Sequence, residues 1–190
     1  MKAIKKQIIR PVHRGVKQQK GFTALEVLGV LAVGLMIIAA AGVFIVNMFE
    51  GNAVKNLTTE ANGTLIDIRK FYSMRPNCTG LNNAVAIANR MVDQNMVNGA
   101  AINHAMGGAV TLTCVAINGN ANQGIQMQFA GIESGDMCSD IVSTMSRTWD
   151  IITIEGANVK AFAGQVDVAA MGNACTAGAS RTIVGIAQRV

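Results

Sequence analysis

Three residues near the start of this chain stand out by their types and spacing. Gly21 and Phe22 follow a basic segment and form a junction for a peptidase, and Glu26 is the only acid among the first 49 residues. A cut between Gly21 and Phe22 would free the α-amino group of Phe22, and Glu26 would become the fifth residue of the shortened chain. A carboxylate and a new ammonium group can pair, so a cut at this junction would create a possible partner for Glu26.

The segment after Glu26 is apolar over an unusual length. The 23 residues from Val27 to Phe49 contain no charge. A helix rises about 1.5 Å per residue, so such a run can cross a hydrocarbon layer of about 30 Å. A secretory signal peptide has a shorter apolar core of about 7–15 residues with a cleavage site after it, and a buried core helix seldom lacks a polar face for so long. The run therefore predicts a membrane-spanning helix.

Glu26 is costly at the start of such a helix. A carboxylate in lipid costs roughly 2.5–3.5 kcal/mol at the bilayer centre and less towards the interface. Two interpretations remain open. Either Glu26 lies at headgroup level and needs no partner, or it pairs with a cation from a second molecule when the helix leaves the lipid for a protein assembly.

The charge distribution predicts an orientation. Residues 1–21 carry seven basic side chains and no acid, and they account for the net charge of +5, because residues 22–190 carry 9 basic and 11 acidic side chains, a balance of −2. By the positive-inside rule the basic segment stays in the cytoplasm and the C-terminal part is exported. The rest of the chain does not predict a nucleic-acid surface, which has clustered Lys and Arg.

All four cysteines lie in the part expected to be exported: Cys78, Cys114, Cys138 and Cys175. Disulfides persist outside the cytoplasm. The spacings of 36, 24 and 37 residues include no CxxC pair, so they do not predict a zinc site. Four cysteines allow three pairings, and the sequence alone does not choose among them.

No catalytic pattern stands out. The sequence contains no GxSxG, HExxH or Walker motif. His104 is isolated in a stretch rich in Asn, Gly and Ala, and we expect it in a solvated loop, whereas Trp149 is expected in the core. We therefore expect no enzyme activity, no cofactor and no metal.

A helical pattern continues beyond the apolar run. Apolar residues recur there at steps of three and four: Val54, Leu57, Ala61, Leu65, Ile68 and Tyr72. This predicts one long helix, with an apolar half over 22–49, in a membrane or in the core of a protein assembly, and an amphipathic half over 50–74. Pro76 ends it, because proline cannot continue a helix and disfavours helical geometry at the residue before it.

Residues 75–190 are expected to form one globular head. Apolar spacing predicts helices over 81–97 and 135–147, the second with Ser134 as N-cap. Strands are expected over 109–117 and 123–130 around a turn at 118–120, and further over 150–154, parts of 158–170 and 181–188. The predicted fold class is α+β, with an antiparallel sheet laid on the long helix.

The segment Gly21-Phe22-Thr23-Ala24-Leu25-Glu26, followed directly by an apolar helix, resembles the processing site of type IV prepilins. In that family a glycine precedes the cut, an N-methylated residue follows it, and glutamate is fifth in the mature chain. The resemblance implies the type IV pilin fold, removal of residues 1–21 by prepilin peptidase, methylation of Phe22 and polymerisation through Phe22 and Glu26.

The expected disulfides are Cys78 with Cys114 and Cys138 with Cys175. The second pair would close a region, 138–175, similar to the C-terminal disulfide-bounded region of type IV pilins, which forms much of the exposed filament surface.

The long leader is similar to that of class-b pilins, although Phe22 is more typical of class a. Over most of its length the chain resembles the PilS-type pilins of adhesive and conjugative thin pili, so we expect the precursor of a major class-b pilin.

The implied partners are prepilin peptidase, which also methylates, other copies of the chain, the inner membrane with its pilus assembly machinery, and a host or recipient-cell receptor; no nucleic acid is expected. The precursor would lie in the inner membrane with a periplasmic head, and the assembled pilus outside the cell. The alternatives are a minor pilin, a type II secretion pseudopilin and a membrane-anchored periplasmic domain.

Overall fold

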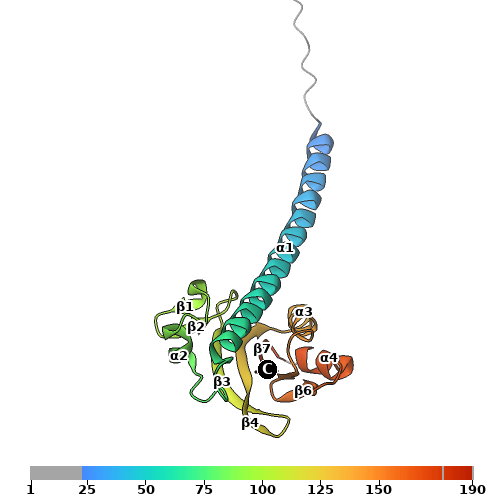
Figure 1. The fold of residues 1–190 in the computed structure, drawn as a ribbon. Helices are drawn as coiled ribbons and strands as arrows, with labels where there is room; N and C mark the ends of the chain where they lie inside the picture. The colour runs from blue at the N-terminus through green and yellow to red at the C-terminus, as the bar shows by residue number, and fades with distance from the viewer. Residues whose placement is uncertain (1–22, 177, 190) are drawn as a thin grey trace, which may run out of the picture. The chain divides into compact units, whose positions relative to one another are not determined.

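The computed structural model describes residues 23–176 and 178–189, with the backbone alone described over 42–50. In chain order the elements are α1 (Ala24–Tyr72), α2 (Asn83–Ala88), the 3-10 helix η1 (Gln94–Met96), β1 (Val97–Asn98), β2 (Ala101–Asn103), β3 (Ala109–Ile117), β4 (Asn120–Glu133), α3 (Asp136–Met145), β5 (Ile151–Ile154), β6 (Ala157–Lys160), α4 (Val168–Thr176) and β7 (Ser180–Gln188) (Figure 1). This combination of a long N-terminal helix with an antiparallel sheet confirms the predicted α+β class. The chain divides between Val43 and Phe44 into two compact units.

The first unit contains the start of α1. The window Ala24–Ala41 has a mean hydropathy of 2.4 and no buried residue, so by length and composition it is able to cross a membrane. Leucine, valine, isoleucine and methionine side chains are exposed around its whole circumference in the isolated chain. An apolar surface on all sides of a helix needs lipid or other helices around it.

The second unit is built on one seven-stranded antiparallel sheet with the order β1-β2-β3-β4-β7-β5-β6. The hairpin expected around residues 118–120 is present as β3 and β4, and β7 lies next to β4 rather than at the edge. Alternate residues face one side. One row across the strands consists of Val110, Phe129, Ile183 and Ile154, all of which are buried.

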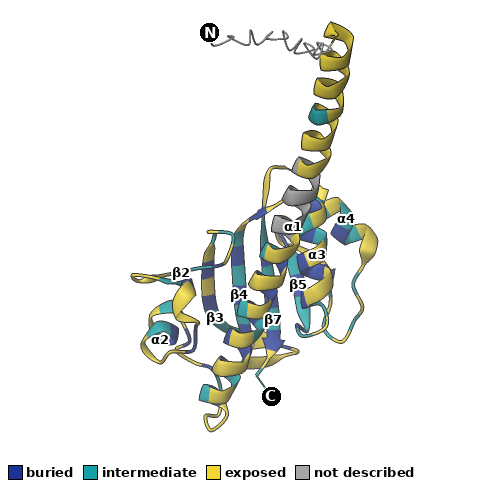
Figure 2. Ribbon diagram, turned by 90° about the horizontal axis from the view of Figure 1, so that it is seen from above, coloured by how far each residue is buried: buried dark blue, intermediate teal, exposed yellow. Residues whose placement is uncertain are grey.

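The second half of α1 covers this buried face, over β3, β4 and β7 (Figure 2). The stripe predicted from the sequence is the side of the helix that packs there, since its six members are at most 9% exposed: Val54, Leu57, Ala61, Leu65, Ile68 and Tyr72. Burying each Val, Leu or Ile side chain of this stripe contributes roughly 1.5–3 kcal/mol. Hydrophobic packing therefore holds this half of the helix on the sheet.

Trp149 lies in the core, as predicted, with 1% of its surface exposed. Its ring fits because β7 has a glycine at the facing position. A Cβ added at Gly185 would lie 2.7 Å from Trp149 Cε3 and 3.0 Å from Met145 Cε. The small residue at 185 thus makes room for α3 and the tryptophan that follows it.

The helix predicted over 81–97 is wrong beyond Ala88. Asn82 caps the start of α2, but the helix closes at once in a Schellman motif, in which Met91 N–H bonds to Ala86 O (2.9 Å) and Arg90 N–H to Ile87 O (3.1 Å). Arg90 takes the left-handed conformation (φ 53°) that is usually filled by glycine. The chain then turns back through η1, which Asp93 caps, into β1.

Part of the segment 158–170 is strand, as expected, because β6 extends to Lys160. The helix α4 begins at Val168, and Asp167 caps it by accepting the Ala170 N–H (2.9 Å). One other expectation is wrong. The N-cap of α3 is Gly135 rather than Ser134, with no side-chain cap, and its φ of 89° suits a glycine. The strand β2 was also missed, since three residues are too few to show alternation.

Candidate functional site

Glu26 closes the first turn of α1. Its Oε2 accepts hydrogen bonds from the backbone N–H of Thr23 (2.9 Å) and from Thr23 Oγ1 (3.0 Å). In return, Glu26 N–H lies 3.3 Å from Thr23 Oγ1. This reciprocal arrangement is a capping box, in which two side chains satisfy backbone groups that the helix start leaves free. A negative charge in the first turn also complements the helix dipole.

The sequence already contained the signal for this cap, because Thr-x-x-Glu before an apolar run is its usual pattern. The two interpretations of Glu26 given above do not include this cap, and they leave Thr23 without a role. In the described residues Glu26 is exposed and only Oε2 accepts a hydrogen bond, so Oε1 remains available for a cation. Gly21 and Phe22 lie outside the described residues, so the cleavage and methylation remain predictions.

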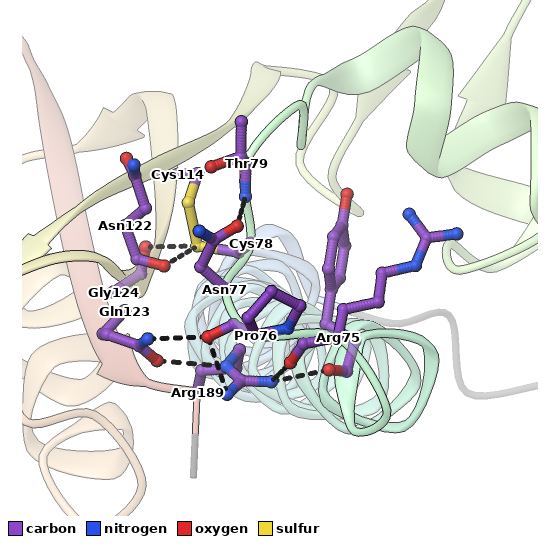
Figure 3. The surroundings of a disulfide bond; sticks show 11 residues. Arg75, Pro76, Asn77, Cys78, Thr79, Cys114, Asn122, Gln123, Gly124 and Arg189 are labelled. Carbon is purple, nitrogen blue, oxygen red and sulfur yellow. Dashed lines mark hydrogen bonds between the residues drawn. A yellow bond between two sulfur atoms is a disulfide. The ribbon is translucent and has the colours of Figure 1, made fainter.

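The first disulfide joins Cys78 to Cys114, which is the expected pair. Cys78 comes six residues after the end of α1, and Cys114 lies in β3. The Cys78 backbone N–H also bonds to Asn122 O (3.0 Å), at the start of β4 (Figure 3). A disulfide sulfur has no hydrogen to donate, so the approach of Cys78 Sγ to the Asn122 carbonyl oxygen (3.2 Å) is a close contact only.

The second disulfide joins Cys138 in α3 to Cys175 in α4, again the expected pair. Both cysteines are fully buried, and the Gly135 N–H bonds to Cys175 O (2.9 Å). The loop between them contains β5, β6 and most of α4. Cross-linking a loop of 37 residues stabilises the folded state by about 3–4 kcal/mol in the chain-entropy model.

His104 is not the solvated loop residue that its neighbours suggested. It is 3% exposed, and its ring lies edge-on to Phe129 with ring centres 6.3 Å apart. Nδ1 accepts the Met106 N–H (3.2 Å), which leaves Nε2 as the donor to Ala130 O (2.8 Å). Burial lowers the pKa of His104, although the bond to Ala130 acts in the opposite direction. The sequence alone gave no sign of this, because the partners lie in a tight turn and in a distant strand.

The histidine fills an irregularity in the sheet. Pairing between β4 and β7 shifts between Phe129 and Ile132, and this frees the Ala130 carbonyl for the imidazole. Gly108 lies so close that an added Cβ would be 1.9 Å from Ala130 O and 2.3 Å from His104 Nε2. No residue other than glycine fits there without moving the histidine.

Glu60 ties the same turn to the long helix. Its Oε2 accepts the Ala105 N–H (3.0 Å). The pKa of this carboxyl is raised, mainly by burial and also by the negative charge of Asp93, while the bond from Ala105 acts against both. The turn after β2 is therefore held from α1 on one side and from β4 on the other.

In the part of the chain that the structure describes, no three His, Cys, Asp or Glu side chains are grouped so that they could bind a metal ion. The polar contacts of the head fasten one segment to another, as Glu60 and His104 do. The described residues thus include a cross-linked head and an apolar helix.

Comparison with known proteins agrees with this architecture. A family model described as PilS N terminal matches residues 45–188. Among solved structures, TcpA, a type IV pilin from Vibrio cholerae El Tor biotype, is 17% identical with a TM-score of 0.52, covering 71% of this chain and 98% of that one. A type IVb pilin from Salmonella typhi is 18% identical with a TM-score of 0.51, covering 73% and 99%. Comparison with curated proteins gives no match.

At these identities the two structures show the shared fold, and the family model shows the relationship. The matched region includes the buried half of α1, all seven strands and both disulfides. With that match over residues 45–188, the chain belongs to the PilS family of type IV pilins.

Proposed function

We propose that this chain is the precursor of the major subunit of a class-b type IV pilus. Prepilin peptidase removes residues 1–21, the new amino group of Phe22 is methylated, and the mature chains polymerise from the inner membrane into a surface fibre. The observation that carries this proposal is Glu26, an exposed carboxylate at the start of an apolar helix in a chain of the type IV pilin family.

The apolar helix supports both states of the proposed cycle. Its first 18 residues can cross a membrane, and their exposed aliphatic side chains can equally pack against helices of other subunits. In the assembly Glu26 pairs with the Phe22 amine of a neighbouring subunit. A buried ammonium group without a partner is strongly unfavourable, so the pair selects the register between neighbours.

The capping box gives Glu26 a second role that the test must separate from the first. Glutamine can replace glutamate in this motif, because its amide oxygen still accepts from the Thr23 N–H. Glu26→Gln therefore keeps the helix start and removes the charge. Thr23→Val is the matched control, since it removes the hydroxyl of the cap and keeps the Glu26 charge.

The assay measures fibres sheared from cells that express each variant with an active prepilin peptidase. We expect Thr23→Val to form fibres in near wild-type amounts, and Glu26→Gln and Glu26→Ala to lose them at least about tenfold, because the loss of a buried ion pair costs several kcal/mol. Normal fibres from Glu26→Gln would show that the negative charge of residue 26 is not required and would remove the pairing argument. Wild-type cells that export the chain without long fibres would instead indicate a minor pilin or a pseudopilin.

The head is proposed to cover the fibre and to make its contacts with other cells. The region closed by Cys138 and Cys175 carries exposed polar residues on α3, β6 and α4. Its disulfide is buried, which protects the cross-link from reductants in the medium. Adhesion, aggregation and mating contact are all served by such a surface, and all of them require the same exported, polymerised chain.

A further inference from the structure

Arg189, beyond the end of β7, holds the end of α1. Its Nη1 donates to the carbonyl oxygens of Tyr72 (2.6 Å) and Arg75, and Nη2 donates to that of Pro76 (3.2 Å) (Figure 3). Its Nε donates to Gln123 Oε1 (3.1 Å). One side chain therefore satisfies three carbonyl groups at and just after the last turn of the helix.

Arg189 adds to donors that already reach this helix end: Lys70 O accepts from Ser73, and Tyr72 O accepts from the Arg75 N–H (2.9 Å) as well as from Arg189. The last carbonyls of a helix have no intrahelical donor, and they are commonly satisfied through a glycine just after the end. Here Ser73, Met74, Arg75 and Pro76 follow, with no glycine, and proline has no N–H to offer. A guanidinium group offers five N–H donors in one plane, and its positive charge complements the negative end of the helix dipole.

A second arginine makes the reverse connection. Arg69, in the last turn of α1, donates through Nε (3.0 Å) and Nη2 (2.7 Å) to the carbonyl oxygen of Gln188, at the end of β7. The helix thus contributes an arginine to the strand, and the strand is followed by an arginine that binds the helix. We call Arg69, Gln188 and Arg189 the arginine latch.

The same end of α1 has a separate, covalent attachment. The disulfide from Cys78 leads to β3, whereas the arginine latch leads to β7, on the other side of β4 in the sheet. Gln123 Nε2 donates to Pro76 O (2.8 Å) and so stands between the two attachments (Figure 3). Three strands therefore hold one helix end: β3 through the disulfide, β4 through Gln123, and β7 through the arginine latch.

We propose that the arginine latch and the Cys78–Cys114 disulfide act in parallel, so that either one alone keeps the end of α1 on the sheet. The latch needs no oxidation. It holds the helix end in a newly exported head whose cysteines are still reduced, and it keeps Cys78 close to Cys114 until they are oxidised. The inference concerns the folded head alone and does not rest on polymerisation.

The test is a cycle of four full-length proteins in detergent: wild type, Arg69→Gln/Arg189→Gln, Cys78→Ser/Cys114→Ser, and the combination of all four changes. Replacing Cys78 and Cys114 removes this disulfide alone and leaves the Cys138–Cys175 disulfide intact. Arg147→Gln is the matched control, because Arg147 is exposed and makes no side-chain hydrogen bond within the described part of the chain. The measured quantity is hydrogen–deuterium exchange in a peptide covering residues 70–78, with α3 as the internal reference.

If the attachments are parallel, each double variant exchanges at most about tenfold faster than wild type over 70–78, and the combined variant exceeds the product of the two effects by about tenfold or more. If the combined variant unfolds while both double variants stay folded, the effects are again non-additive and the proposal is supported. The proposal is overturned if the cysteine variant alone frees residues 70–78 as fully as the combination does, or if the arginine variant behaves like Arg147→Gln.

Discussion

His104 offers the sharpest test of how the head is held together, because its ring connects the turn after β2 to the strand β4. His104→Ala removes the donor to Ala130 O and the acceptor for the Met106 N–H. It also removes a ring that is 3% exposed and lies against Phe129. The variant keeps every other residue of the turn.

The expected loss follows from these contacts. Leaving a buried carbonyl or N–H without a partner costs about 1–3 kcal/mol each, and the cavity left by the ring adds to this. We therefore expect His104→Ala to lower the free energy of unfolding by about 3 kcal/mol or more. His104→Gln is the milder comparison, since its amide can still donate to Ala130 O, and we expect a loss of about 1 kcal/mol.

The histidine also predicts a pH dependence. Because burial lowers its pKa in the folded head, the unfolded chain takes up a proton near pH 6.5 that the folded chain does not. The unfolded state then binds more protons, so the stability contributed by neutral His104 is complete above about pH 6.5 and is lost as the pH falls. The raised pKa of Glu60 acts in the opposite sense, with stability falling as the pH rises above about 4.5.

The assay is urea unfolding of the full-length chain in detergent at about pH 7.5 and about pH 5.5. The wild type should be less stable at the lower pH, and His104→Gln should lose that part of the difference, while Glu60→Gln should retain it. A cost below about 1 kcal/mol for His104→Ala, or an unchanged pH difference in His104→Gln, would refute the reasoning.

Two further predictions concern packing and cross-linking. Gly185→Ala should destabilise the head by about 2 kcal/mol or more, measured by urea unfolding, because the new Cβ would lie 2.7 Å from Trp149 Cε3; a neutral effect would mean that the ring moves freely. Cys138→Ser/Cys175→Ser should lower the free energy of unfolding by about 3–4 kcal/mol through the loop of 37 residues it opens, and a loss under about 1 kcal/mol would contradict that estimate.

The regular parts of the fold could be predicted because their patterns are repeated. The buried stripe of α1 shows six times at helical spacing, and the β3–β4 hairpin shows alternating apolar residues on both sides of an Asn-Gly turn. Trp149 is large and apolar, and such side chains are usually buried. In the helix and the hairpin many residues predict the same structure, so no single exception changes the prediction.

The parts that failed depend on single residues in unusual roles. Arg90 ends α2 in a conformation that normally selects glycine, so the apolar spacing up to Met96 suggested a longer helix. His104 is buried only because Ala130 offers a free carbonyl where two strands slip. Arg189 binds the end of a helix more than a hundred residues earlier. Contacts of this kind depend on the tertiary fold, so the residues next to them in the sequence do not predict them.

Cleavage after Gly21 and methylation of Phe22 can be measured together by intact mass spectrometry of the chain purified from its native host. We expect the mass of residues 22–190 plus one methyl group, with four hydrogens fewer before reduction than after it because of the two disulfides. A full-length, unmethylated chain from cells with active prepilin peptidase would contradict it, and a membrane-anchored domain would then be the better description.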